Sequence, residues 1–307
     1  MTVARSIQEL VGNTPMLEIT RFDLPPGVRI FAKLESFNPG GSVKDRIGLE
    51  MIAAAERTGK LRPGGTIIEP TAGNTGIGLA LAAIGKGYRV IFCVPEKFSQ
   101  EKQELIRALG AEVVNTPTEK GMQGAIEKAQ ELARQIPGAF VPQQFANPAN
   151  PAAHYKTTGP EIWRQMEGRV HVLVAGAGSG GTFTGVARYL KEQNPAIRCC
   201  IVEPEGSVLR GGTPGPHRTE GIGVEAIYPT LDLRLADEIY TVRDDDAFAM
   251  VRELARREGV LAGSSSGAAF WAALQEAHRH PPGTNIVVIF PDSSERYLSK
   301  RIYQGGI

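Results

Sequence analysis

Short apolar runs rich in valine and isoleucine alternate with amphipathic helical patterns along most of the chain. The runs fall at residues 66–70, 88–95, 111–117, 139–145, 170–177, 199–205, 238–242 and 285–291. Strands that alternate with helices form parallel sheets whose two faces are both covered by helices. The alternation therefore predicts an α/β fold built from doubly wound parallel sheets. A Pro- and Asn-rich break near residues 145–155 divides it into two units with a cleft between them.

Charge and hydropathy exclude several classes of function. The 34 basic and 33 acidic side chains give a net charge of +1, so no overall field attracts nucleic acid or an anionic membrane. The N-terminus lacks the apolar core of a signal peptide, and no segment approaches the roughly 18 apolar residues of a membrane span. We expect a soluble, cytoplasmic protein whose partners are small molecules.

The cysteines and histidines do not suggest a metal site. Cys93, Cys199 and Cys200 all fall inside expected strands. Adjacent strand residues point to opposite faces, so the pair at 199–200 is poorly placed for a disulfide or a metal. The five histidines form no HxH or HExxH pattern. We expect buried cysteines and no bound metal.

A glycine-rich turn separates the strand at 170–177 from the helix that follows it. Glycines permit positive φ angles and close backbone approach, so N–H groups at the helix start can converge on a phosphate. The turn also spells GxGxxG through Gly176, Gly178 and Gly181, and Glu203 ends the next strand. That spacing is typical of dinucleotide-binding folds, so an NAD-linked oxidoreductase competes with a simple phosphate cradle. Tight strand–helix packing is a third explanation.

Two further helix starts carry polar side chains. Thr71, Asn74 and Thr75 bring donors to the start of one helix, and such a junction suits a carboxylate. Capping of that helix by Asn74 is the simpler explanation. Three serines at 264–266 open another helix, where capping by Ser264 or Ser265 explains them equally well.

Lys44 stands just inside the start of a helix that Ser42 is expected to cap, after two glycines. The first turn of a helix carries partial positive charge, so a lysine there is disfavoured by up to about 1 kcal/mol. This repulsion and burial lower the pKa of a lysine, and its neutral amine is a nucleophile toward aldehydes. Together with a phosphate cradle and a carboxylate cradle, the amine predicts a pyridoxal-phosphate site rather than a solvated surface lysine.

Six segments, taken together, resemble one enzyme family. In chain order they read VGNTPMLEI, NPGGSVKDR, EPTAGNTGIGLA, GSGGT, EGIG and GSSSGAA. They are similar to the cysteine synthase/cystathionine β-synthase family of fold-type II pyridoxal-phosphate enzymes. The resemblance implies two domains like those of the tryptophan synthase β-subunit, with the cofactor in the cleft between them. Residues 1–41 plus 148–307 would form the larger, cofactor-binding domain, and residues 42–147 a smaller, mobile substrate-loop domain.

The resemblance also implies a role for each matching residue. Lys44 would bind the cofactor aldehyde covalently and act as the catalytic base. Asn74 would bind the 3′-oxygen of the cofactor, and Ser265 its pyridine nitrogen. The cofactor phosphate would be bound by Gly178, Ser179, Gly180, Gly181 and Thr182. The substrate would be enclosed by Thr71, Ala72, Gly73, Thr75, Gln144 and Gly221.

The implied reaction is a β-replacement on an amino acid. A serine partner leaves the pyridine nitrogen neutral, which favours elimination of a β-leaving group over a long-lived carbanion. A thiol or sulfide then adds at Cβ. Ala72 replaces the serine usual in cysteine synthases, and residues 291–300 look closer to cystathionine β-synthases. The resemblance thus favours homodimeric, compact bacterial members that form cystathionine from homocysteine and O-acetylserine (or serine), with a sulfide-using cysteine synthase as the alternative.

Overall fold

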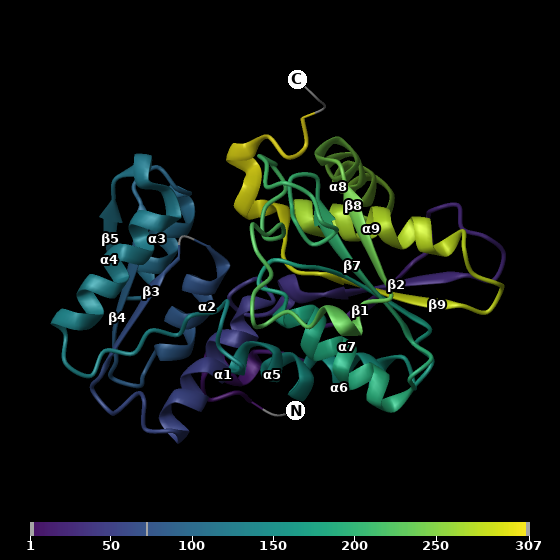
Figure 1. The fold of residues 1–307 in the computed structure, drawn as a ribbon. Coiled ribbons are helices and arrows are strands. Elements are labelled where there is room, and N and C mark those ends of the chain that lie inside the picture. The colour runs from purple at the N-terminus through teal and green to yellow at the C-terminus, as the bar shows by residue number, and fades with distance from the viewer. Residues whose placement is uncertain (1–2, 72, 305–307) are drawn as a thin grey trace. The chain divides into compact units, whose positions relative to one another are not determined.

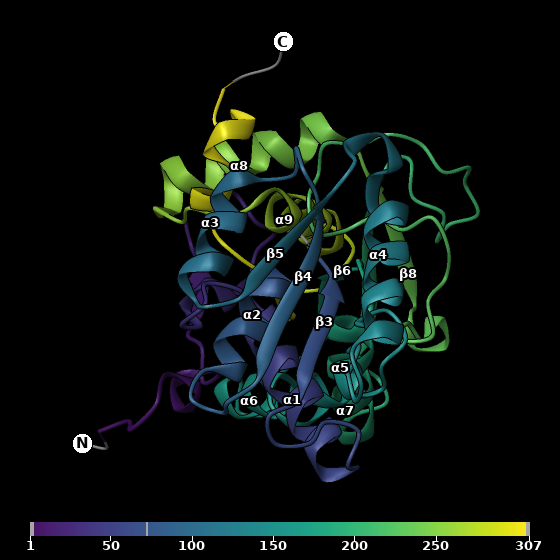
Figure 2. The same ribbon diagram turned by 90° about the vertical axis from the view of Figure 1, so that its left-hand side faces the viewer.

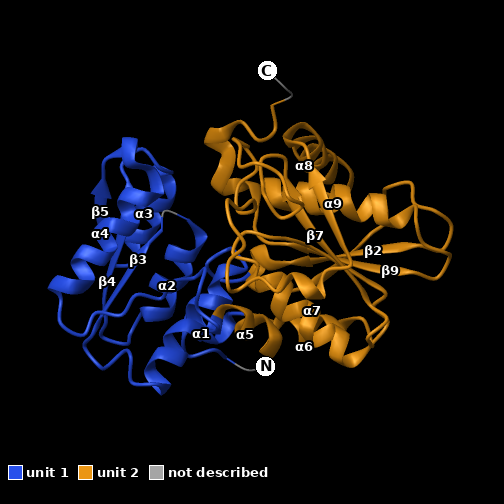
Figure 3. Ribbon diagram, in the orientation of Figure 1, with its two compact units in different colours: residues 1–11, 38–149 blue, residues 12–37, 150–307 orange. Residues whose placement is uncertain are grey.

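The computed structural model describes residues 3–71 and 73–304 and divides into two compact units (Figures 1 and 3). Unit 1 comprises residues 1–11 and 38–149, and unit 2 comprises residues 12–37 and 150–307. Residues 3–11 group with the smaller unit, whereas the sequence-based division assigned them to the larger one. The cause is local: from the 3-10 helix η1 (Ile7–Leu10), the side-chain amide of Gln8 donates to the carbonyls of Leu81 and Ile84, each at 3.0 Å.

Unit 2 is built on a six-stranded sheet whose strands run in the order β1-β2-β9-β6-β7-β8. Only the β1–β2 pair is antiparallel, and the other neighbours are parallel, as the alternation predicts. The strands are β1 (Met16–Ile19), β2 (Arg29–Leu34), β6 (Val172–Gly176), β7 (Arg198–Pro204), β8 (Glu238–Val242) and β9 (Asn285–Phe290). The helices are α5 (Ala149–Lys156), α6 (Thr158–Gln165), α7 (Gly181–Gln193), α8 (Asp244–Glu258) and α9 (Ser264–Ala277).

Successive residues of these strands pack on opposite faces of the sheet. Val174 and Cys200 lie in the core formed with α8 and α9, whereas Leu173 and Cys199 lie in the core formed with α6 and α7. The cysteines are therefore buried on different faces, as the sequence predicts. Burial raises the pKa of the Cys199 thiol to about 12 and that of Cys200 further, so both are neutral and pack as small apolar side chains.

Unit 1 contains a three-stranded parallel sheet in the order β3-β4-β5, which Figure 2 views from one side. Helix α4 packs on β3 and β4 through Ala125 and Ala129, which meet Ile68, Ile91 and Cys93. Helix α1 packs along α2, which also contacts β4 and α3. The elements are α1 (Lys44–Arg57), β3 (Thr66–Pro70), α2 (Asn74–Ala83), β4 (Arg89–Pro95), α3 (Gln100–Ala108), β5 (Glu112–Thr116) and α4 (Gly121–Gln135).

One expected strand does not form. In residues 139–145 only Phe140 pairs with the sheet, through an isolated parallel bridge to Ile67. Pro142 has no N–H to donate, and Gln143 adopts a left-handed conformation with φ of 55°. The chain therefore turns at this point instead of extending β3.

The described residues contain neither a membrane-spanning helix nor a cluster of metal-binding side chains. No helix within residues 3–71 and 73–304 is long and apolar enough to cross a bilayer. Over the same ranges, no three histidine, cysteine, aspartate or glutamate side chains group closely enough to hold a metal ion.

Candidate active site

Lys44 is the first residue of α1, and the preceding loop is held to the helix start by hydrogen bonds. The N–H of Lys44 donates to Oγ of Ser42 at 3.2 Å, although Val43 occupies the N-cap position. The carboxylate of Asp45 accepts the N–H of Gly40 at 2.5 Å. These bonds fix the backbone that carries Lys44, but the expectation that Ser42 caps the helix is wrong, because Val43 occupies the N-cap position.

Two glycines bring the backbones of α1 and α2 together. A Cβ on Gly48 would lie 2.4 Å from the carbonyl oxygen of Gly78, and a Cβ on Gly78 would lie 2.5 Å from that of Lys44. Both distances are shorter than a Cβ tolerates, so neither position accepts a side chain without a backbone shift. Gly78 follows Asn74 by about one helical turn. The N-terminal end of α1, which begins at Lys44, therefore lies against α2 at Gly78, about one turn from Asn74 at the start of that helix.

The residues expected to enclose the substrate carboxylate gather around the start of α2. Oγ1 of Thr71 accepts the N–H of Gly73 at 3.3 Å, and the hydroxyl of Thr75 donates to Oε1 of Gln144 at 2.7 Å. Gly73 rather than Asn74 occupies the N-cap position, so the simple capping explanation for Asn74 is wrong. Ala72 lies outside the described residues.

In unit 2, the loop between β6 and α7 presents N–H groups at a helix start. Gly180 has φ of 83°, a left-handed conformation that favours glycine. Over the described residues, no protein acceptor meets the backbone N–H of Gly178, Ser179, Gly180 or Thr182. Such N–H groups at the positive end of a 13-residue helix form an anion site. The loop therefore fits a phosphate, as the sequence predicts.

Packing also requires two of these glycines. A Cβ on Gly178 would lie 2.4 Å from the carbonyl oxygen of Gly221, and one on Gly181 would lie 2.0 Å from Oδ1 of Asn150. The amide of Asn150 also donates to Oγ of Ser179 at 2.9 Å. The tight-packing explanation and the phosphate-cradle explanation thus apply to the same loop.

Gly221 and Ser265 lie on adjoining segments of unit 2. A Cβ on Gly221 would lie 3.8 Å from Oγ of Ser265, and the N–H of Glu220 donates to Oγ of Ser264 at 3.0 Å. Gly263 occupies the N-cap position of α9 without a side-chain cap. Capping therefore does not explain this pair of serines: Ser264 holds the segment that contains Gly221, and the buried Ser265 lies beside it.

Asp244 supports the same segment and was not identified from the sequence. Its carboxylate accepts the N–H of Arg218 at 2.7 Å, the N–H of Thr219 at 2.9 Å and the hydroxyl of Thr219 at 2.7 Å. The only local signal was an acidic run at the start of α8, which a favourable helix dipole explains by itself. Its partners lie 25 and 26 residues away, and no spacing rule links them.

Glu203 does not offer the carboxylate that a dinucleotide site needs. This buried side chain accepts the N–H of Leu209 at 2.9 Å, the N–H of Arg210 at 3.2 Å and the hydroxyl of Thr241 at 3.1 Å. Its oxygens hold the loop that follows β7, and a ribose hydroxyl would have to displace those bonds. Glu203 was the residue that distinguished an NAD-linked oxidoreductase from a simple phosphate cradle, so its engagement weakens the oxidoreductase hypothesis.

The chain belongs to the family described as pyridoxal-phosphate dependent enzyme, whose model matches residues 7–292. The protein is therefore a pyridoxal-phosphate dependent enzyme with an α/β fold of type II, and the N–H groups at the start of α7 fit the phosphate of that cofactor.

Two curated relatives and one solved structure match the chain over nearly its full length. An O-acetylserine dependent cystathionine β-synthase from Bacillus subtilis is 57% identical over 307 residues, which is 100% of both chains. A cysteine synthase from Helicobacter pylori is 54% identical over 99% of this chain and 100% of its own. A crystal structure of an O-acetylserine dependent cystathionine β-synthase from Helicobacter pylori, 54% identical, matches with a TM-score of 0.94 over 99% of this chain and 100% of that chain.

Proposed function

We propose that the enzyme replaces the acetoxy group of O-acetylserine with the thiol of homocysteine, giving cystathionine and acetate. The full-length identity to the Bacillus subtilis O-acetylserine dependent cystathionine β-synthase carries this proposal. A cysteine synthase that uses sulfide in place of homocysteine is the second candidate, and it is supported by the Helicobacter pylori relative of that name. Serine is the alternative first substrate.

Bound pyridoxal phosphate withdraws electrons from the α-carbon of the amino acid that it holds. We assign Lys44 as the residue that would bind the cofactor and whose Nζ would take the α-proton, because it begins α1 within the segment SVKDR that resembles the family. Asn74 would bind the 3′-oxygen, and the hydroxyl of Ser265 would donate to the neutral pyridine nitrogen. With the cofactor bound, this withdrawal would let the acetoxy group leave Cβ as acetate and let the thiol add there.

The remaining roles are those that the family resemblance implies for the matching residues. The phosphate is held by Gly178, Ser179, Gly180, Gly181 and Thr182. The substrate carboxylate is held by Thr71, Ala72, Gly73, Thr75 and Gln144, with Gly221 near the substrate. Residues 42–147, within unit 1, would then form the mobile substrate-loop domain, and unit 2 would supply the cofactor-binding domain.

We also propose that the enzyme is cytoplasmic and a homodimer; the homodimer rests on the family resemblance. Light scattering of the holoenzyme should then give twice the chain mass of 33.0 kDa. A mass equal to that of a single chain would contradict the dimer and leave the proposed reaction untouched.

Four specificity constants test the reaction. Serine and O-acetylserine are each offered with homocysteine and with sulfide, and kcat/KM is measured for every pair. We expect O-acetylserine with homocysteine to exceed each other pair by about tenfold or more, because small differences in a binding site are worth about 1–3 kcal/mol. A higher constant with sulfide would favour the cysteine synthase candidate, and no product from any pair would overturn both.

A further inference from the structure

Glu69 ends β3 with a buried carboxylate that the proposed reaction does not use. Its side chain is 1% exposed, and no ion pair reaches it from the described parts of the chain. Its two oxygens instead accept consecutive backbone N–H groups, from Gln143 to Oε2 at 2.9 Å and from Gln144 to Oε1 at 3.0 Å. Burying a carboxylate is unfavourable unless such bonds compensate it, so its presence here calls for an explanation.

The two bonds hold a turn that interrupts an otherwise extended segment. Gln143 has φ of 55°, a conformation that non-glycine residues rarely adopt, and its carbonyl accepts the N–H groups of Ala146 and Asn147 at 2.9 Å each. The next side chain along the turn is that of Gln144, whose Oε1 accepts the hydroxyl of Thr75 at 2.7 Å. Glu69 thus fixes the backbone from which Gln144 reaches the start of α2.

We propose that Glu69 is a positioning residue for the binding of the substrate carboxylate, and that it acts through the backbone of Gln144. This rests on the proposed function, which assigns Thr75 and Gln144 to that carboxylate. The ionised side chain offers one oxygen to each N–H group. A protonated carboxyl or an amide offers one good acceptor only, so one of the two bonds is lost and the turn loosens.

The surroundings of Glu69 let its charge change near neutral pH. Burial raises its pKa to about 7, against the two backbone hydrogen bonds that lower it, and no other charged group of the described residues shifts it. Phe92 of β4 is its partner in the sheet register, and α2 carries no ionisable side chain. From α4, Lys128 and Glu131 bind each other at 2.9 Å and act on the Cys93 thiol instead.

The test compares wild type with Glu69→Gln by titrating L-serine into the holoenzyme and following the cofactor absorption. At about pH 8 the variant should bind serine about tenfold more weakly, whereas at about pH 6 the two affinities should converge, because the wild-type carboxyl is then protonated. In steady-state kinetics with serine as the varied substrate, the substitution should change kcat less than KM. Glu112→Gln, an exposed change on β5 of the same unit, should match wild type at both pH values.

Unfolding by urea supplies a readout without substrate. Because the folded protein keeps the Glu69 proton up to a pH of about 7 and the unfolded chain releases it near 4.5, wild-type stability should fall relative to Glu69→Gln as pH rises between those values. An affinity ratio that stays constant with pH would overturn the inference, as would an unchanged affinity.

If Glu69→Gln does not fold, the wild type alone supplies the test of the role given to Glu69. Below about pH 7, the serine affinity of the wild type should then rise with pH more steeply than release of one proton, that of the substrate amine, would require. A pH dependence equal to release of that one proton would overturn the inference. The serine titration needs no product. Failure of the proposed reaction, with no product from any pair, is therefore distinguishable from failure of the role given to Glu69.

Discussion

Lys44→Ala should yield a folded protein that lacks the yellow colour of the wild type and turns over at least about 10⁴-fold more slowly. Lys44→Arg should behave in the same way, because a guanidinium keeps the positive charge but neither attacks an aldehyde nor releases a proton. The measurements are the absorption spectrum of the purified protein and kcat with O-acetylserine and homocysteine. Lys60→Ala, an exposed change of the same type in unit 1, is the matched control and should retain both colour and rate.

Chemical trapping tests directly for the covalent bond between Lys44 and the cofactor. Reduction of the wild-type holoenzyme with borohydride, followed by peptide mapping, should locate the pyridoxyl group on Lys44. An adduct on another lysine would contradict the assignment, and so would a Lys44→Ala protein that keeps the absorption and the rate of the wild type.

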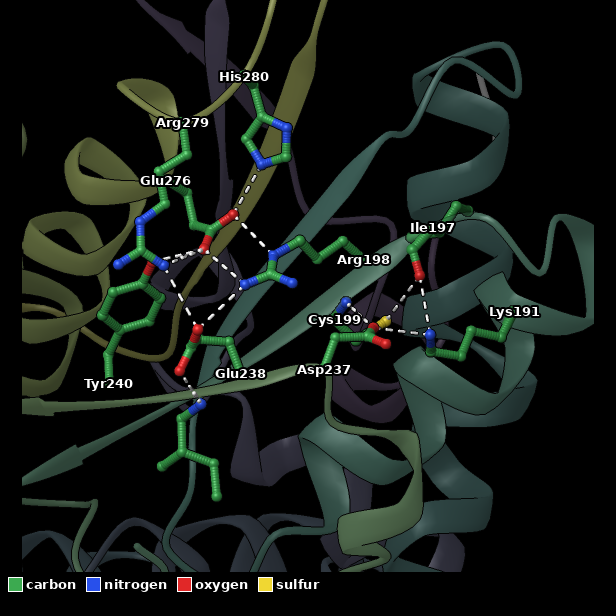
Figure 4. A network of polar contacts seen from close by, with 11 residues as sticks. Lys191, Ile197, Arg198, Cys199, Asp237, Glu238, Tyr240, Glu276, Arg279 and His280 are labelled. Carbon is green, nitrogen blue, oxygen red and sulfur yellow. Dashed lines mark hydrogen bonds and ion pairs between the residues drawn. The ribbon is translucent and has the colours of Figure 1, made fainter.

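Glu276→Gln should lower the free energy of unfolding at about pH 7 by about 3 kcal/mol. Figure 4 shows the Glu276 carboxylate, from α9, among the side chains of Arg198, Tyr240 and His280. This carboxylate is fully buried. It accepts hydrogen bonds from the hydroxyl of Tyr240 at 2.5 Å and from Nε of Arg198 at 3.1 Å, and it lies 2.7 Å from Nε2 of His280. An amide removes the charge and turns a donor toward these donors. Urea unfolding measures the change.

Glu238→Gln is the matched control, because Glu238 binds the same Arg198 at 3.2 Å but its side chain is 30% exposed. Its loss should be below about 1 kcal/mol, as for other ion pairs open to solvent. Equal losses for the two variants would contradict the role of burial in this network.

The loss at Glu276 should also depend on pH. Burial alone would raise the pKa of this carboxyl, but the hydrogen bonds from Tyr240, His280 and Arg198 outweigh it and hold the pKa below 4.5. The stabilising contribution is therefore present above a pH of about 4.5 and disappears as pH falls through the lowered pKa. Below that lowered pKa the wild type and Glu276→Gln should approach equal stability.

Much of the fold was predictable because the strands of parallel sheets are buried on both faces. The runs at 66–70 and 238–242 match β3 and β8, and the opposite packing of Cys199 and Cys200 follows from strand geometry. β1 and β2 were missed because β1 has four residues and β2 carries charged side chains. The run at 139–145 has a strand-like composition, but a proline and a left-handed residue interrupt it.

The candidate site was predictable where its chemistry is local in the sequence. Lys44, the loop at 178–182 and the junction at 71–75 each combine a helix start with suitable side chains, and their roles stay predictions. Glu69 and Asp244 gave no such signal, because each binds backbone N–H groups far along the chain, 74 and 75 residues away for Glu69. Such partners become visible only once the chain is folded.

The burial of the cysteines affects how they would react with the proposed thiol substrates. Thiol–disulfide exchange needs a thiolate, and burial keeps the pKa of Cys93 at about 11 and that of Cys199 at about 12. An enzyme that handles homocysteine or sulfide continually meets such nucleophiles and their oxidised forms. With its three cysteines protonated and buried, the chain would resist forming mixed disulfides with these thiols.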